Sequence, residues 1–258
     1  GGVAAPTPVK DRPLHGTLLK TQFEKAWESA QAELVQVKSS KEGFYIEFIS
    51  NPDLELLTKS LEDLRSKQIR LLNIRTTQDD QGQFITLATV FVHRSKKDFF
   101  IKKLEEYLTQ DTPKGNPKNE ALINSIAAIK HAIGVEPFWT DADVPIPTDA
   151  PEWIEVWLST TNQDSITSFD QLLIQHAIPR KTGQITFPER TVIVIFANAK
   201  TLTLLQELSD FIAEYRKAKT TSSFFTELQA KDQLEWVHNI EARLKISEAP
   251  YSSICIFD

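Results

Sequence analysis

Residues 190–198 read RTVIVIFAN, and this stretch decides the fold. The run from Val192 to Phe196 is almost entirely β-branched or aromatic, which predicts a strand buried on both faces. Asn198 follows as a helix-capping residue, and apolar residues then recur at helical spacing from Leu202 to Tyr215. The stretch therefore predicts a buried strand that leads directly into a long helix.

The residues before this stretch predict three more elements. Alternating apolar residues indicate a strand over 153–159, helical spacing indicates a helix over 167–177, and residues 183–187 suit a short strand. Together with 190–198 and its helix they give the order β-α-β-β-α. Beyond them we expect a helix over 223–244 and a last strand over 252–257.

The first half of the chain predicts the same order. The expected elements, after a first helix over 18–37, are a strand over 44–50, a helix from Asn51-Pro52-Asp53 through Leu64, strands over 68–76 and 84–93, and a helix from Ser95. Asn116-Pro117 then starts a further expected helix, whose apolar side runs from Leu122 to Ile133.

Two β-α-β-β-α units predict an α+β protein with two tandem ferredoxin-like sandwiches and extra helices. We expect the sixth element of each sandwich to be irregular or to come from elsewhere in the chain. The predicted segments are a disordered lead-in over 1–13, sandwiches over 14–136 and 152–246, a proline-rich linker over 137–151, and a last strand over 247–258 that begins a truncated domain.

Composition limits the classes of partner. The 258 residues are 41% hydrophobic and 25% charged, which suits a soluble globular chain, and the formal net charge is −6. An acidic chain is a poor general binder of nucleic acid or of an anionic membrane, so we expect neither partner. No apolar run approaches the ~18 residues of a membrane span. The single cysteine, Cys255, favours a reducing compartment, hence a cytoplasmic protein.

Side chains that could carry chemistry are few. No glycine-rich phosphate loop and no nucleophile elbow is present, so we expect no cofactor and no local serine nucleophile. The histidines lack the spacing of a zinc site, and we expect ordinary packed or surface residues and no metal. They are His15, His93, His131, His176 and His238. Cys255 lies in an apolar strand and is expected to act as a small hydrophobe.

Two further segments have alternative interpretations. Phe138-Trp139-Thr140-Asp141, followed by Asp143, is either a contact site or a linker pinned by its aromatic residues, and the pinned linker is favoured. The residues around the helix that starts at Ser95 are locally basic. They form either a solvated face, which is favoured, or a docking patch for an acidic partner, and they are Arg94, Lys96, Lys97, Lys102 and Lys103.

The last strand ends in an aspartate. Residues 253–258 read SICIFD, and open α/β enzymes place reactive groups where a buried strand ends, although many strands end in Asp because of turns. With this segment in view, the chain from about Asp11 onward resembles the N-terminal region of a group of bacterial subtilisin-like serine peptidases. The segments that carry the resemblance are RPLHG at 12–16, FWTD at 138–141, EVWL at 155–158 and FPERT at 187–191.

The resemblance implies a role for Asp258. In that group the peptidase domain begins with an apolar strand followed by Asp-Thr-Gly, and Ile254 to Asp258 match this strand. Asp258 would then be the acid of an Asp-His-Ser triad and would orient the catalytic histidine in the full-length protein. The Thr-Gly, the histidine segment and the Gly-Thr-Ser-x-Ala nucleophile segment are missing here. The resemblance also implies a neighbouring gene for an AAA-type ATPase.

Three functions remain open. Subtilase propeptides commonly adopt a ferredoxin-like sandwich that packs on their own peptidase domain, so a regulatory prodomain is the first. A module that docks an AAA-type ATPase is the second, since the region is longer than such a propeptide, and the two can coexist. RNA binding through a ferredoxin-like sheet is the third and least favoured, because the strand over 84–93 lacks the basic Gly-aromatic motif.

We expect this chain alone to hydrolyse no peptide, since an acid without its base and nucleophile cannot carry out acyl transfer. Incubation with a serine-directed phosphonate, followed by mass spectrometry of the intact chain, should show no adduct. Stoichiometric labelling would contradict the assignment.

Overall fold

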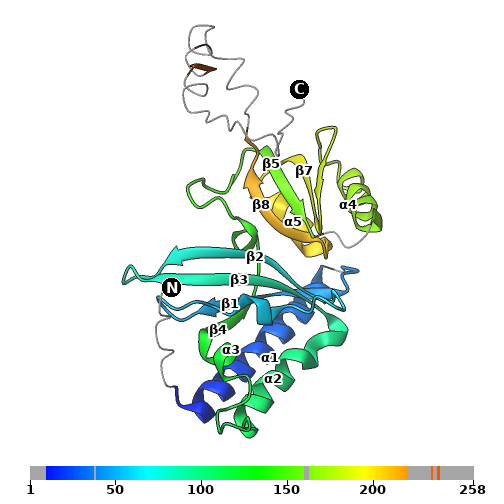
Figure 1. The fold of residues 1–258 in the computed structure, drawn as a ribbon. Coiled ribbons are helices and arrows are strands. Elements are labelled where there is room, and N and C mark those ends of the chain that lie inside the picture. Colours follow the sequence, from blue (N-terminus) through cyan, green and yellow to red (C-terminus); the bar gives the residue numbers. More distant parts are fainter. Residues whose placement is uncertain (1–9, 38, 160–162, 220–233, 235–236, 239–258) are drawn as a thin grey trace, which may run out of the picture. The chain divides into compact units, whose positions relative to one another are not determined.

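The computed structural model describes residues 10–37, 39–159 and 163–219, together with Leu234, Val237 and His238. Residues 1–218 form one compact unit and residues 219–258 a second. The first unit holds two four-stranded antiparallel sheets (Figure 1). The two sheets have equivalent strand orders, β2-β3-β1-β4 and β6-β7-β5-β8.

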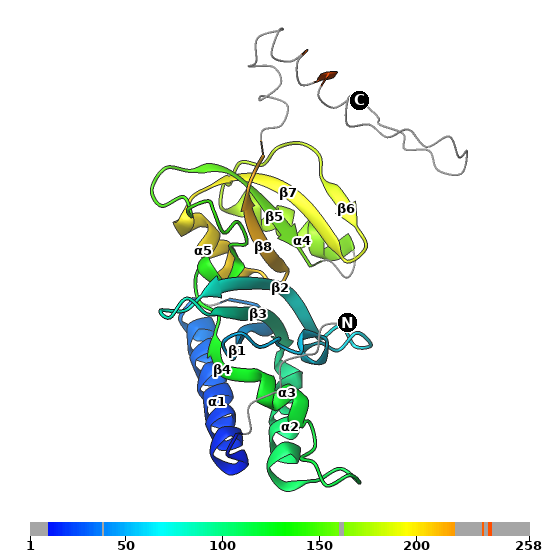
Figure 2. The same cartoon turned by 60° about the vertical axis from the view of Figure 1, so that its left-hand side comes forward.

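The second sandwich is a complete βαββαβ unit. Its elements are β5 (Glu152–Leu158), α4 (Gln163–Gln175), β6 (Ile185–Phe187), β7 (Arg190–Ala197), α5 (Ala199–Leu208) and β8 (Ile212–Lys217). Ile154, Val156 and Leu158 alternate along β5 and are fully buried, so this face of the sheet packs on the two helices (Figure 2). The tandem ferredoxin-like prediction is confirmed for this half.

The first sandwich has the same strand order with a different source for one helix. Its elements are α1 (Arg12–Gln36), β1 (Gly43–Ser50), η1 (Thr58–Leu61), β2 (Ile69–Gln78), β3 (Phe84–His93), η2 (Arg94–Lys96), α2 (Lys97–Thr109), α3 (Glu120–Ser125), β4 (Ile126–His131) and η3 (Glu136–Phe138).

Helix α1 supplies the helix that a ferredoxin-like unit normally carries between its first two strands. Phe23 of α1 lies 5.5 Å from Phe100 of α2, ring centre to ring centre, and Trp27 lies edge-on 4.6 Å from Phe44 of β1. Both helices therefore cover one face of the first sheet (Figure 1). Such aromatic pairs add to the stabilisation that burial already provides.

The helix predicted from Asn51 through Leu64 is wrong, because only the short η1 forms there. Asp53 adopts a left-handed conformation with φ 53°, which prevents a helix from starting at Pro52. The Asp53 carboxylate instead accepts a hydrogen bond from the Phe84 N–H at 3.1 Å, and its own N–H donates to the Phe84 carbonyl at 2.8 Å. The segment between β1 and η1 is thus hydrogen-bonded to the start of β3.

Two predicted helices change into strands partway. The helix expected from Asn116 to Ile133 ends at Ser125 and continues as β4, and the one expected through Tyr215 ends at Leu208 and continues as β8. Each strand pairs with the open edge of a central strand, as in the pairs Phe48 with Ile129 and Val156 with Tyr215. The hydrogen bonds and packing gained by completing each sheet override the local helical periodicity. These two strands are the sixth elements of the sandwiches, which we expected to be irregular or to come from elsewhere in the chain.

The outer face of the first sheet is buried by the second sandwich. Tyr45, Leu72 and Phe91 belong to the same apolar cluster as the core of the second half. In contrast, the prediction that residues 192–196 are buried on both faces is wrong at two positions: Val194 and Phe196 are only half-buried on the outer face of the second sheet, whereas Val192 is buried there.

The segment boundaries differ in part from those predicted. Lys10 already makes an ordered contact, its Nζ lying 2.8 Å from Asn51 Oδ1, and α1 begins at Arg12, inside the predicted disordered lead-in. The predicted linker is partly buried: Phe138 is fully enclosed and Trp139 is 8% exposed. This confirms that aromatic residues pin the segment. Residues 247–258, the predicted last strand, lie outside the described residues.

The structure predicts a large difference between two phenylalanines. Phe48→Ala should lower the free energy of unfolding by about 3–5 kcal/mol, because the fully buried ring packs 4.9 Å from that of Phe100 and would leave a cavity. Phe84→Ala is the matched control, since this ring is 57% exposed and its loss should cost much less. Urea unfolding measures both, and equal losses would contradict the burial assigned to β1.

Candidate functional site

The junction between the two sandwiches gathers charged groups that are partly or wholly buried. We call five residues the interdomain clasp: Lys41, Tyr45, Arg70, Arg190 and Asp210. The Tyr45 hydroxyl donates to the Ser209 carbonyl at 2.5 Å, and its ring packs edge-on against Phe138 at 4.9 Å. The clasp therefore combines apolar packing with directional hydrogen bonds between the halves.

The two arginines of the clasp donate to main-chain carbonyls of the opposite sandwich. Arg70 donates to Ser159 O at 2.9 Å and to Asp210 O at 2.7 Å. Arg190 donates in the reverse direction, to the carbonyls of Leu71 and Leu72 at 3.1 Å each. Arg70 also lies 4.2 Å from the centre of the Phe91 ring. These contacts join the start of β2 to the second sheet.

Lys41 is the most enclosed charge of the clasp, and Asp210 is half-buried. The Lys41 ammonium donates to the Gln206 carbonyl at 3.0 Å and lies 4.0 Å from the Tyr45 ring centre. Burial lowers the pKa of Lys41 to about 8, although Asp210 and other acids oppose the shift. Burial likewise raises the pKa of Asp210, whose carboxylate accepts the Glu42 N–H at 2.6 Å.

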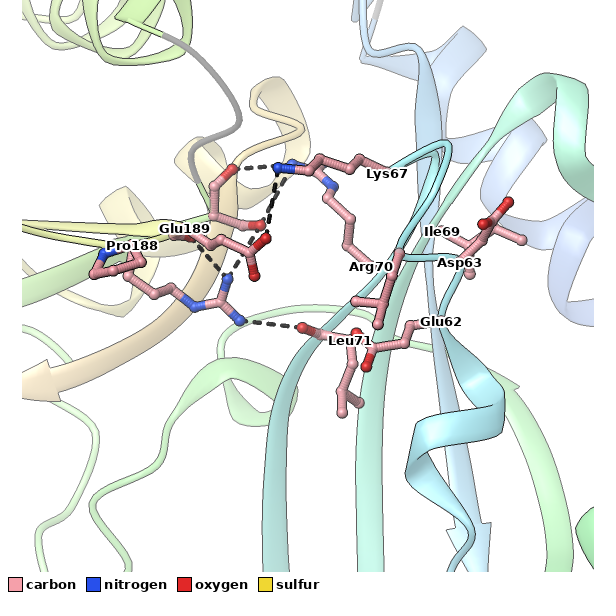
Figure 3. Close-up of a pocket in the computed structure, with 11 residues that line it drawn as sticks. Glu62, Asp63, Lys67, Ile69, Arg70, Leu71, Pro188 and Glu189 are labelled. Atoms are coloured by element: carbon pink, nitrogen blue, oxygen red, sulfur yellow. Dashed lines mark hydrogen bonds and ion pairs between the residues drawn. The ribbon is translucent and has the colours of Figure 1, made fainter.

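A pocket of about 340 Å³ lies beside the clasp, which is at the small end of the range for ligand sites. Its first wall is the segment from Glu62 to Leu71, and its second is formed by Ser159 and residues 188–190. Figure 3 shows Pro188 and Glu189 facing Lys67 and Arg70 across the pocket. The pocket thus exists only where both sandwiches meet.

The outer face of the second sheet carries a second surface, which we call the aromatic face: Trp153, Trp157, Phe187 and Phe196. Trp153 pairs with Phe196 at 5.1 Å between ring centres, and Trp157 stacks on Phe187 at 5.8 Å with an interplanar angle of 2°. Phe187 is 47% exposed. In the part of the chain that the structure describes, helices cover only the opposite face of this sheet.

The charges around the aromatic face are mixed. Arg216 lies 4.4 Å from the Trp157 ring centre and is also bound by Glu214 at 2.9 Å. Lys181 lies 4.9 Å from the Trp153 ring centre, while Glu155 accepts the Trp157 indole N–H at 3.3 Å. A surface that is apolar, half-exposed and nearly balanced in charge is typical of a protein contact.

The sequence-predicted residues that the structure describes lie on separate elements. Asp258 and Cys255 lie outside the described residues. His131 lies on β4 and not on a helix, and burial lowers its pKa to about 4. His15 is buried on α1, 3.0 Å from the Ile123 carbonyl, and His238 is exposed. Within the described residues, no group of histidine, cysteine and acidic side chains is placed to hold a metal.

Neither the clasp nor the aromatic face was identified from sequence. Arg190 and Phe187 occur in a segment that carries the subtilase resemblance, yet that pattern does not indicate their contacts. Among the locally basic residues around the start of α2, Arg94 and Lys102 are exposed, whereas Lys96, Lys97 and Lys103 are half-buried. Lys97 and Lys103 lie near the rings of Trp27 and Phe99. No helix among residues 10–37, 39–159 and 163–219 is long and apolar enough to cross a membrane.

Comparisons with known proteins identify no family. No family model and no curated protein matches the chain. Solved structures with a distant likeness include an unknown protein from Galdieria sulphuraria, with 9% identity, 64% of this chain and 86% of that chain covered, and a TM-score of 0.24. Another is the regulatory subunit of aspartate kinase from Thermus thermophilus, with 15% identity, coverages of 64% and 90%, and a TM-score of 0.21. Likenesses this distant carry no functional argument.

The buried Lys41 predicts a pH dependence of stability. Because its folded-state pKa of about 8 lies below the ordinary 10.5, the unfolded chain binds more protons between these values, and stability rises with pH there. Relative to Lys41→Met, the wild type should gain up to about 3 kcal/mol of unfolding free energy from pH 8 to pH 10.5.

Chemical unfolding of both proteins across this pH range measures the gain. Lys114→Met is the control, because Lys114 is exposed and its replacement should leave the difference from wild type independent of pH. A wild-type profile parallel to that of Lys41→Met would contradict the burial of Lys41.

Proposed function

We propose that this chain is the non-catalytic N-terminal regulatory region of a cytoplasmic bacterial subtilisin-like serine peptidase, and that it docks on the peptidase domain through the aromatic face. The observation that carries the proposal is the exposure of this face in a tandem of ferredoxin-like sandwiches. The outer face of the first sheet is occupied by the second sandwich, whereas the outer face of the second sheet carries half-buried Trp153 and Trp157 beside exposed Phe187.

The energetics favour a protein partner for this surface. Large aromatic side chains on a rigid sheet bury much apolar area at little cost in conformational entropy, and they dominate the free energy of protein interfaces. The edge strand β6 adds Ile185, which is 61% exposed, beside Phe187. The acids Glu155 and Glu214 lie among these rings and disfavour a polyanion such as RNA.

The proposal predicts a defined loss of binding. The double variant Trp153→Ala/Trp157→Ala should bind the peptidase domain encoded by the same gene at least about tenfold more weakly than wild type, since aromatic anchors at an interface commonly contribute 2 kcal/mol or more. Calorimetry with a peptidase domain whose catalytic serine is replaced measures this. Leu14→Ala/Val35→Ala is the control, because these α1 side chains are 71% and 73% exposed and lie in the first sandwich.

Other outcomes point elsewhere. A gene that encodes no subtilase histidine and serine segments would overturn the peptidase assignment, as would equal binding by both double variants. If the double tryptophan variant loses binding only to an AAA-type ATPase encoded by a neighbouring gene, and not to the peptidase domain, the aromatic face is assigned to the ATPase. Salt-dependent binding of short single-stranded RNA that requires the two tryptophans would assign it to nucleic acid.

A further inference from the structure

The interdomain pocket brings two arginines to one hydroxyl group, within a lining of three basic and three acidic side chains. The two clasp arginines reach this hydroxyl from opposite sandwiches: Arg70 Nη1 lies 3.4 Å from Ser159 Oγ, and Arg190 Nη1 lies 3.3 Å from it. Both side chains line the pocket, and Lys67 lines it as well. Two guanidinium cations held around one oxygen repel each other, so this arrangement is costly unless a negative charge compensates.

Neither arginine has a carboxylate partner. Among the described residues, no carboxylate oxygen lies within ion-pair distance of Arg70 or Arg190, although eleven other basic side chains do have one. Their hydrogen bonds go to neutral carbonyl and hydroxyl oxygens, and Arg70 Nε is buried with no hydrogen-bond partner. Buried cations without a directly bound counter-charge are destabilising.

The effect of burial on both groups agrees with this geometry. Burial is the main cause that lowers the pKa of Arg70 and of Arg190. Tyr45 and Asp210 oppose the shift in the pKa of Arg70, whereas the charge of Arg190 adds to it. The acids Glu214, Glu189 and Glu62 oppose the shift in the pKa of Arg190. Both groups nevertheless keep their charge at neutral pH, because an arginine is effectively always protonated. The pocket therefore holds two permanent and incompletely neutralised charges.

The rim limits what can enter. Lys67 at the mouth forms a 3.5 Å ion pair with Glu189, and Glu62 and Asp63 also line the pocket. These acids disfavour a long polyanion, whose further charges would meet them. The small volume and the apolar side chains of Leu71 and Pro188 suit a compact ligand with one anionic group.

We propose that this pocket binds a small molecule through a carboxylate or phosphate group held by Arg70 and Arg190, and that the ligand strengthens the contact between the two sandwiches. A planar guanidinium matches either oxyanion with paired hydrogen bonds. A ligand that binds only the joined arrangement stabilises it by mass action. The inference concerns a different surface from the aromatic face and does not depend on the peptidase proposal.

The test uses the whole chain alone, so its failure is distinct from a failure of peptidase docking. Thermal unfolding and calorimetry are carried out with inorganic phosphate and with acetate, each against chloride at matched ionic strength. We expect at least one of the two anions to raise Tm saturably above the chloride value. A response to phosphate alone assigns a phosphate group, and a response to acetate alone assigns a carboxylate.

Variants locate the response. Arg190→Gln should weaken binding of the active anion at least about tenfold, as expected when one of two charged donors is lost. Arg12→Gln, which removes a cation paired with Asp111 in the first sandwich, should bind as wild type does. If Arg190→Gln does not fold, Lys67→Gln tests the proposal in its place. Lys67 is half-exposed and lies outside the clasp, so its replacement should weaken anion binding severalfold without lowering the Tm of the free protein. No excess stabilisation over chloride, or equal binding by the pocket variant and Arg12→Gln, would overturn the proposal.

Discussion

The structure depends on the two-sided burial of strand β1. Its inward residues pack on α1 and α2, and its outward Tyr45 packs on Phe138 and reaches Ser209 in the second sandwich. A ferredoxin-like sheet normally covers one face with its own helices and leaves the other to solvent or to a partner. Here the second sandwich takes the partner's place, so the first sheet has no large free face in the described part of the chain.

Covering that face buries polar groups of both sandwiches, and the clasp gives most of them a hydrogen-bond partner. Main-chain carbonyls of both halves accept hydrogen bonds from Arg70, Arg190 and Lys41. Several clasp atoms still lack a partner, among them Arg70 Nε and one oxygen of Asp210. Incomplete satisfaction of this kind makes an interface sensitive to bound ions and to pH.

The two candidate surfaces draw on the two sandwiches differently. The pocket needs both halves, since one wall is the segment from Glu62 to Leu71, which includes the start of β2, and the other is formed by Ser159 and residues 188–190. The aromatic face belongs to the second sandwich alone and uses the same β7 strand that carries Arg190 at its start. A ligand at Arg190 and a partner at Phe196 would therefore be connected through one strand, which is a short physical path between two sites.

Periodicity in the sequence predicted the α+β class and the βαββα order of the second half, whereas the helix predicted between the first two strands of the first half does not form. It predicted helices where β4 and β8 form, since the free edges of β1 and β5 that these strands complete are visible only after folding. Tertiary structure alone decided the candidate sites. Arg70 meets Ser159 across 89 residues and Arg190 meets Leu71 across 119, and no local pattern encodes contacts at such separations. Likewise, which sheet face stays open depends on which one the neighbouring sandwich covers.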